Sequence, residues 1–97
     1  MAARTRYLVS YDIADPKRLR RVAKACEGFG SRIQYSVFEC PLDDLRFQQL
    51  RAELDSLIQH EEDQVLFVSL GPENSANPFR IEAIGLPYSE RSRVTVI

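Results

Sequence analysis

Asp12 is the residue whose position most suggests chemistry. It lies at the end of "RYLVSYDIADP", where side chains alternate with the period of a β-strand, so the strand itself carries the carboxylate. One side of this strand is the more apolar and is expected to face the core; it comprises Tyr7, Val9 and Tyr11. Asp12 shares the other side with Leu8 and Ser10. The alternation therefore predicts that Asp12 points away from the core.

A carboxylate at this place has two possible roles. Mg²⁺ prefers six oxygen ligands and usually takes one or two carboxylates, with waters and phosphate completing the set. Asp12 alone is a poor cation site, but a two-fold axis would add the Asp12 of a second copy, and a shared metal would support phosphodiester cleavage. Alternatively, Asp12 merely accepts amide hydrogen bonds in the turn that follows the strand. Local spacing leaves both alternatives open.

Other chemistries have little support in the sequence. His60 is the only histidine and lies in the acidic segment "QHEEDQ", which argues against a histidine-based triad or a histidine-rich metal site. The four glycines do not fit a P-loop or a dinucleotide-binding loop. Cys26 and Cys40 are too few for a structural zinc site and are expected to be free thiols. Of the chemistries considered, the one that the sequence still supports is that of a carboxylate.

The charge is unevenly distributed, although the net charge is −1. Residues 1–40 contain eight basic and four acidic residues, a net charge of +4, whereas residues 41–97 contain five basic and ten acidic residues, a net charge of −5. Such a chain can bind a polyanion on one face, because phosphate binding depends on local charge. Two ordinary solvated faces would produce the same count.

The first strand is followed by a predicted basic helix. Asp15 is a good N-cap and Pro16 fits the first helical position, while Gly28 and Gly30 end the segment. An apolar stripe is expected to face the core; it comprises Leu19, Val22, Ala23 and Cys26. The remaining surface carries the cations that could contact nucleic acid, Arg18, Arg20 and Arg21 among them.

The rest of the chain supplies further strands and one more helix. "SRIQYSVFECPL", residues 31–42, is one bent strand or two short ones. A second helix begins after Asp43 or Asp44, and "VLFVSLG" is a continuous apolar run that suits a central strand covered on at least one face. Residues 71–78 are expected to form a loop, and "RIEAIG" and "RVTVI" two short strands.

The order of these elements predicts one α+β domain over residues 1–97. If residues 31–42 form two strands, the arrangement is the ferredoxin-like βαββαβ sandwich, with both helices on one face of an antiparallel sheet and an extra C-terminal strand. The uncovered face would be buried in a homodimer, to which the tail at residues 79–97 can add strands. Arg32 could contact phosphate and Phe38 could pack at the dimer seam; a solvated arginine and a half-buried aromatic are the alternatives.

No apolar run approaches the ~20 residues that a membrane span requires. The first residues, "MAARTR", lack the pattern of a secretory signal, so a cytoplasmic protein without membrane association is expected.

Several of these blocks, taken in order, resemble the Cas-two family, the small CRISPR-associated adaptation protein. The matching blocks are "YLVSYDIAD", "KRLRRVAK", "RIQYSVFEC", "EDQVLFVSLG" and "IEAIGLPY". The resemblance implies a ferredoxin-like homodimer that acts in spacer acquisition beside the Cas-one integrase. It also implies a metal-dependent endonuclease for RNA or double-stranded DNA.

The resemblance also implies roles for individual residues. Asp12 matches the family aspartate that binds Mg²⁺ between subunits, and Tyr11 matches the tyrosine before it. Three residues fall in the second family block and join the implied catalytic or nucleic-acid-binding set: Arg32, Ser36 and Phe38. Arg21 matches a family arginine of the first helix. The family also allows a dimer that cleaves nothing and bridges integrase dimers on spacer DNA, and fold analogy allows a toxin-like ribonuclease.

Overall fold

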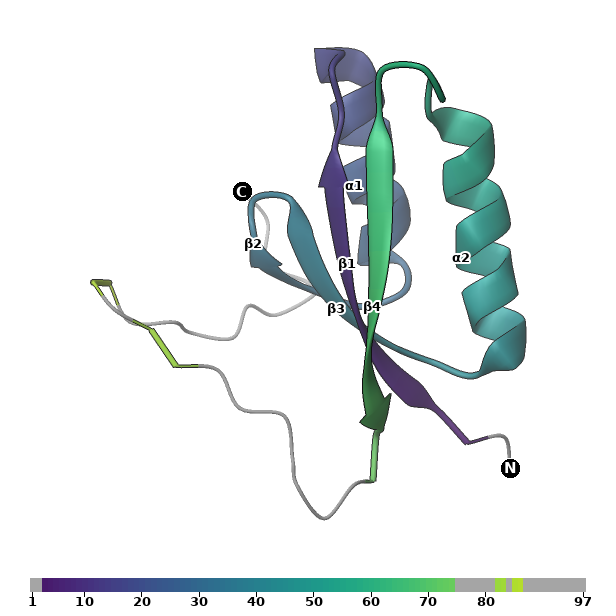
Figure 1. The fold of residues 1–97 in the computed structure, drawn as a ribbon, viewed down its shortest axis with the longest axis vertical. Coiled ribbons are helices and arrows are strands. Elements are labelled where there is room, and N and C mark those ends of the chain that lie inside the picture. Colours follow the sequence, from purple (N-terminus) through teal and green to yellow (C-terminus); the bar gives the residue numbers. More distant parts are fainter. Residues whose placement is uncertain (1–2, 75–81, 84, 87–97) are drawn as a thin grey trace.

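A computed structural model describes residues 3–74, 82–83 and 85–86. The elements follow in the order β1 (Thr5–Asp12), α1 (Pro16–Glu27), β2 (Ser31–Gln34), β3 (Val37–Leu42), α2 (Asp44–Leu57) and β4 (Gln64–Pro72) (Figure 1). The predicted βαββαβ order is therefore confirmed. Residues 31–42 form two strands, because the chain turns between Gln34 and Val37.

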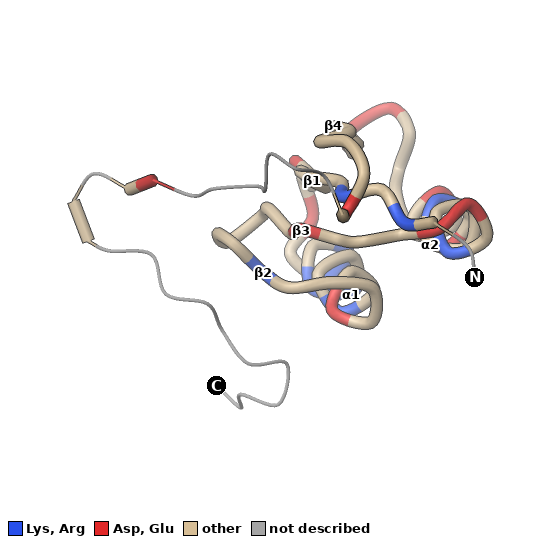
Figure 2. Tube along the Cα trace, turned by 90° about the horizontal axis from the view of Figure 1, so that it is seen from below, with Lys and Arg blue, Asp and Glu red and all other residues tan. Residues whose placement is uncertain are grey.

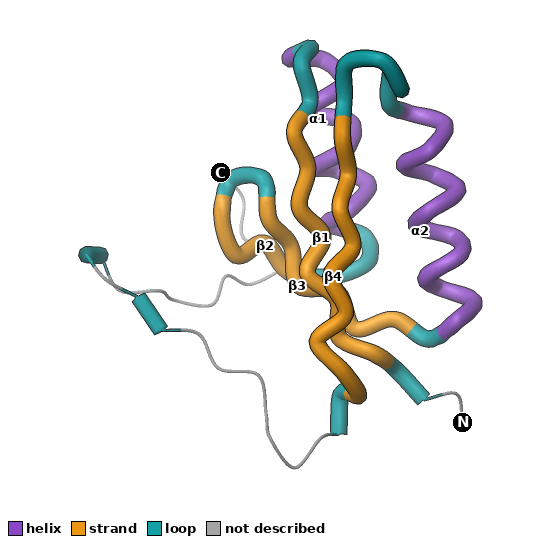
Figure 3. The backbone as a smooth tube through the Cα atoms, viewed as in Figure 1, coloured by secondary structure: helices purple, strands orange, loops and turns teal. Residues whose placement is uncertain are grey.

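The four strands form one antiparallel sheet in the order β2-β3-β1-β4. Both helices lie on the same side of this sheet, and its other side carries no helix of the described chain (Figure 3). This is the ferredoxin-like arrangement expected from the sequence. No helix in the described ranges is long and apolar enough to cross a membrane.

The alternation predicted for β1 decides which side chains enter the core. Val9 and Tyr11 are buried, whereas Asp12 at the end of the strand is exposed. The register pairs Val9 with Phe38 on β3 and with Phe67 on β4, so these three side chains share the helix-covered face. The core therefore lies between the sheet and the two helices.

Helix α1 begins and packs as predicted. Asp15 is its N-cap, with Oδ2 accepting a hydrogen bond from the backbone N–H of Arg18 at 3.0 Å, and Pro16 occupies the first turn. The apolar stripe faces the sheet, since Val22, Ala23 and Cys26 are buried. The charged residues of the helix other than Arg18 are thereby left on the outer surface.

Helix α2 is capped by Asp43, whose Oδ1 accepts from the backbone N–H of Arg46 at 2.8 Å. Leu50 and Leu54 are its buried residues, and Phe47 packs at the edge of the core against Tyr7 with ring centroids 4.8 Å apart.

Strand β4 differs in part from the prediction. It contains the apolar run "VLFVSLG" and is covered by the helices on one face, but it lies at an edge of the sheet that the described residues form. Within the described sheet β4 pairs with β1 alone, so the predicted central position is not seen there. The predicted strands "RIEAIG" and "RVTVI" belong to the proposed tail at residues 79–97. Of the first, only Glu82, Ala83 and Gly85 are described, and none of them is in a strand; the second lies outside the described residues.

Candidate metal and nucleic-acid site

The Asp12 carboxylate lies on the uncovered side of the sheet. Asp12 is the last residue of β1, is exposed, and is paired in register with Gln64 at the start of β4. Within the described residues, its side chain has no hydrogen bond and no ion pair. The carboxylate is therefore available to a ligand from outside the subunit.

Two other aspartates accept hydrogen bonds from backbone N–H groups of the segment that follows Asp12. Asp15 caps α1, and Asp63 accepts the backbone N–H of Ala14 at 2.9 Å on Oδ1. The alternative role for Asp12, acceptance of amide hydrogen bonds in this turn, is thus filled by other residues.

Asp63 also binds Arg18. The Arg18 Nε donates to Asp63 Oδ2 at 2.9 Å, and Arg18 Nη2 donates to Asp63 Oδ1 at 3.3 Å and to Glu62 Oε1 at 2.9 Å. The Asp63 side chain is 0% exposed. The guanidinium of Arg18 is the main reason that the pKa of the Asp63 carboxyl lies well below its usual range, and the N–H groups of Ala14 and Gln59 act in the same direction.

Tyr11 and Phe38 lie behind Asp12, in the core. Tyr11 is 4% exposed, and its hydroxyl donates to the Tyr35 carbonyl at 3.3 Å. Burial raises the pKa of Tyr11, while neighbouring Arg32 opposes part of that rise. Phe38 is fully buried, with its ring stacked 6.3 Å from that of Tyr11. The prediction that Phe38 packs at a dimer seam is wrong, because the register of β1 and β3 turns it toward the helices.

Arg32 belongs to the same inner cluster. It is opposite Phe38 in the β2–β3 register, and its guanidinium carbon lies 5.2 Å from the Phe38 ring centroid and 5.9 Å from that of Tyr35. Its Nε is buried and has no hydrogen-bond partner among the described residues. Arg32 is therefore neither a freely solvated strand-end arginine nor on the side of the sheet that bears Asp12.

Ser36 lies in the turn between β2 and β3. Its carbonyl accepts the backbone N–H of Tyr11 at 3.1 Å, which ties this turn to the residue before Asp12. The Ser36 side chain is half-buried. Its predicted contact with nucleic acid stays a prediction.

The exposed face of α1 carries a row of cations. Lys17, Arg20, Arg21 and Lys24 recur at helical spacing and line a shallow hollow of about 330 Å³. We call these four residues the α1 stripe; none has an ion pair or hydrogen bond from its side chain within the described residues. Figure 2 shows the basic residues gathered along α1.

Arg18 does not belong to the α1 stripe. It was predicted with Arg20 and Arg21 as a nucleic-acid contact, yet its side chain is 23% exposed and is held by Asp63 and Glu62. The sequence interpretation thus included an arginine that is internally paired, and its set of contact residues left out Lys17 and Lys24. The spacing 17, 20, 21, 24 would have identified the stripe.

Asp63 was also missed. In the sequence, "QHEEDQ" stood out only as an acidic segment that contains His60, and a hydrogen bond that spans 49 residues has no local signature. Its one signal is its place immediately before a strand that pairs with β1.

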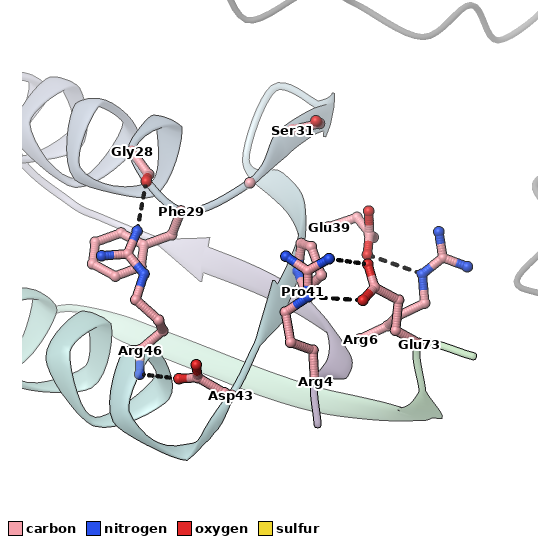
Figure 4. A pocket seen from close by; sticks show the side chains of 11 residues that line it. Arg4, Arg6, Gly28, Phe29, Ser31, Glu39, Pro41, Asp43, Arg46 and Glu73 are labelled. Atoms are coloured by element: carbon pink, nitrogen blue, oxygen red, sulfur yellow. Dashed lines mark hydrogen bonds and ion pairs between the residues drawn. The ribbon is translucent and has the colours of Figure 1, made fainter. Parts of the chain in front are cut away.

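A second hollow lies at the opposite end of β1. It has a volume of about 400 Å³ (Figure 4). Arg4 pairs with Glu73 at 2.8 Å and Arg6 with Glu39 at 3.2 Å, while Arg46 donates to the Gly28 carbonyl at 3.1 Å. The arginines that line this hollow are thus engaged within the chain, and the hollow is a weaker candidate site than Asp12.

The residues around Asp12 fit a hard cation only in part. No group of three or more His, Cys, Asp or Glu residues that could hold a metal occurs among the residues described. Asp12 supplies one carboxylate, which is within the range that Mg²⁺ accepts when waters, phosphate or a second chain complete the ligands. The described residues therefore supply one carboxylate of the six oxygen ligands that a hard cation prefers.

Comparisons with known proteins bear on the family to which the chain belongs. The family model for CRISPR associated protein Cas2 matches residues 5–77. The "CRISPR-associated endoribonuclease Cas2" of Geobacter sulfurreducens is 40% identical over 91 residues, covering 94% of this chain and 95% of the relative. The "CRISPR-associated endonuclease Cas2" of Halalkalibacterium halodurans is 45% identical over 69 residues, covering 66% of this chain and 72% of the relative.

A solved structure extends the likeness to three dimensions. The crystal structure of Streptococcus pyogenes Cas2 at pH 6.5 aligns with a TM-score of 0.71 and 38% sequence identity, covering 82% of this chain and 99% of that one. The family match over most of the chain, the relative that spans nearly all of it and the shared fold lead to one conclusion: this chain belongs to the CRISPR-associated Cas2 family.

Proposed function

We propose that this chain is a Mg²⁺-dependent endonuclease of CRISPR spacer acquisition, with Asp12 of two subunits binding one metal ion. The observation that carries the proposal is the exposed Asp12 carboxylate, which has no partner among the described residues while Asp15 and Asp63 hold the neighbouring donors. An acid left free at a strand end is well suited to a cation.

The second subunit is proposed to cover the open face of the sheet. Leu66 and Val68 on β4 lie on the same side as Asp12 and are 48% and 46% exposed. Leu8 is opposite Val68 in the register and continues this apolar surface. A homodimer formed here would bury apolar side chains and bring two copies of Asp12 to one seam.

The residues of the chain would have two kinds of role in such a site, metal binding and positioning. Asp12 provides the negative charge and oxygen ligands, and a bound Mg²⁺ would activate water or stabilise the leaving oxygen. Tyr11, Arg32 and Phe38 support the strand end from the core side, where they do not reach a substrate on the open face. We therefore assign these three residues to positioning and keep Asp12 as the single catalytic residue.

The substrate is proposed to be RNA or double-stranded DNA. The relatives carry both kinds of name, endoribonuclease and endonuclease. The cations of the α1 stripe lie on the helix side of the sheet, so they could hold a distant part of the nucleic acid by its phosphates, without reading its bases, but not the phosphodiester at Asp12. A cytoplasmic location is part of the proposal, and the buried free thiol of Cys26 agrees with it.

The test is cleavage of labelled RNA and duplex DNA by the full chain, with Mg²⁺ or with a chelator. Asp12→Asn keeps the shape of the side chain and removes the charge, so cleavage should fall at least about a hundredfold if the metal supplies several kcal/mol. Asp44→Asn, an exposed acid in the first turn of α2, is the matched control and should cleave like the wild type.

Two results would overturn the proposal. Cleavage that survives in Asp12→Asn would show that the activity does not depend on this carboxylate. Absence of cleavage by the wild type on both substrates would favour the second candidate function.

That second candidate is a non-catalytic dimer that bridges Cas-one integrase dimers and holds spacer DNA. The α1 stripe favours it, since its four cations lie on the helix side of the sheet, away from the face that bears Asp12. Spacer integration should then be lost in Arg20→Glu combined with Arg21→Glu, and retained in Asp12→Asn. The opposite pattern would exclude the bridging function.

A further inference from the structure

The turn between β1 and α1 contains an amide that Asp12 would ordinarily use. An aspartate side chain commonly accepts the backbone N–H two residues further on, forming an Asx turn. For Asp12 that N–H belongs to Ala14. An Asx turn here would hold the carboxylate against its own backbone and remove one of its oxygens from the open face.

Ala14 gives this hydrogen to a different residue. Its N–H donates to Oδ1 of Asp63 at 2.9 Å, across 49 residues of sequence. Asp63 Oδ2 also accepts the backbone N–H of Gln59 at 2.8 Å and the Nε of Arg18 at 2.9 Å. Hydrogen bonds to an ionised carboxylate are stronger than neutral ones, so Asp63 binds the turn firmly.

The sheet register places Asp63 where it can do this. Asp12 is opposite Gln64, so Asp63 lies one residue beyond the last pair of β1 and β4, beside the turn. Ile13 is 8% exposed and anchors the same turn in the core. The Asp63 side chain is 0% exposed, whereas Ala14, whose N–H it accepts, is an exposed residue.

We infer that Asp63 is a positioning residue for Asp12: it occupies the Ala14 amide and thereby keeps the Asp12 carboxylate free for a cation. The inference rests on the proposed function in so far as the cation is concerned. The hydrogen-bond competition between the two aspartates is independent of any metal.

The competition is tested by the exchange of the Ala14 amide proton with water, measured by NMR in four full-length proteins: wild type, Asp12→Ala, Asp63→Ala and the double variant. Asp12→Ala should leave the exchange rate unchanged in the wild-type background, because Asp63 holds the proton. The same change should accelerate exchange in the Asp63→Ala background, where Asp12 has become the acceptor.

Mg²⁺ affinity, measured by calorimetry, gives the second readout. Residues that support a metal ligand typically alter affinity by 10- to 100-fold when removed, and we expect Asp63→Ala to weaken binding about tenfold. Asp63→Asn keeps an oxygen for Ala14 and should bind Mg²⁺ nearly as the wild type does. Glu62→Gln, which removes only the negative charge of an outer partner of Arg18, is the matched control.

The outcomes separate this inference from the proposed function. Faster Ala14 exchange in Asp12→Ala alone would overturn the inference, and this arm needs no change at Asp63, so it decides the question even if Asp63→Ala does not fold. An unchanged Mg²⁺ affinity in folded Asp63→Ala would also overturn it. A wild type that binds no Mg²⁺ would refute the proposed function, while the exchange cycle would still decide the competition.

Discussion

Removing charges from the α1 stripe should change how nucleic-acid binding depends on salt. The stripe spans eight residues from Lys17 to Lys24, and the seven steps of 1.5 Å between them cover about 10 Å of helix. Phosphates along one DNA strand advance by about 3.4 Å of helix axis each, so the stripe can meet about three or four of them. Arg20→Gln combined with Arg21→Gln removes two of the four cations while keeping long polar side chains.

The magnitude follows from counterion release. The logarithm of the binding constant falls with the logarithm of the salt concentration at a slope of about −0.9 per phosphate contact, so four contacts give about −3.6 and two give about −1.8. Between 50 and 200 mM salt, the wild-type constant should fall about 150-fold and that of the double variant about 12-fold. Both values refer to one subunit's stripe.

Fluorescence anisotropy with duplex DNA, in the Asp12→Asn background and with chelator, measures binding without cleavage. Arg51→Gln removes one exposed cation from α2 and is the control, since it should leave the slope unchanged. Two outcomes would refute the assignment of phosphate contacts to α1. One is a double variant whose salt dependence has the wild-type slope. The other is an Arg51→Gln variant whose slope is reduced as much as that of single Arg20→Gln.

Other predictions concern the fold and the proposed seam. Gly30→Ala should lower the free energy of unfolding by about 1–3 kcal/mol in urea denaturation, because its Cβ would clash with the Glu39 backbone carbonyl and lie 2.6 Å from the Cys40 Sγ; Gly28→Ala, whose nearest contact is 3.4 Å, is the milder control. Leu66→Asp should give a folded monomer in sedimentation analysis, and a dimer unaffected by it would place the seam elsewhere. The Asp63 carboxyl has a lowered pKa in the folded protein, so the stability it contributes is fully present above about pH 3.9 and is lost as the pH falls toward the folded-state pKa. The difference in unfolding free energy between wild type and Asp63→Asn should therefore shrink only below about pH 3.9.

Local patterns were sufficient for most of the architecture. The alternation in β1, the Asp15 and Pro16 start of α1 and the buried stripe of that helix depend on periodicity and capping, which act within a few residues. The structure confirms all three. The choice between one strand and two at residues 31–42 required the turn itself, since both have the same composition.

Local sequence patterns could not predict the features that depend on contacts between residues far apart in the chain. Phe38 enters the core because β3 pairs with β1 in a register that places it opposite Val9, and no local signal fixes that register. Arg18 resembles its neighbours in the basic helix, yet its partner Asp63 lies 45 residues away. Asp12, by contrast, was identified from the sequence, because its exposure follows from its position in an alternating strand.

Tyr11 and Asp12 are consecutive residues of β1, so their side chains point to opposite faces of the sheet, and the number of residues that precede Asp12 in the strand decides which face carries the carboxylate. Inserting or deleting a single residue between Thr5 and Tyr11 would exchange the two faces, burying the acid and exposing the phenol, whatever the side chains on the helices. The exposure of Asp12 should therefore survive substitutions in the core more readily than changes in the length of β1. Among natural variants of this protein, we expect insertions near β1 to fall outside Thr5–Asp12.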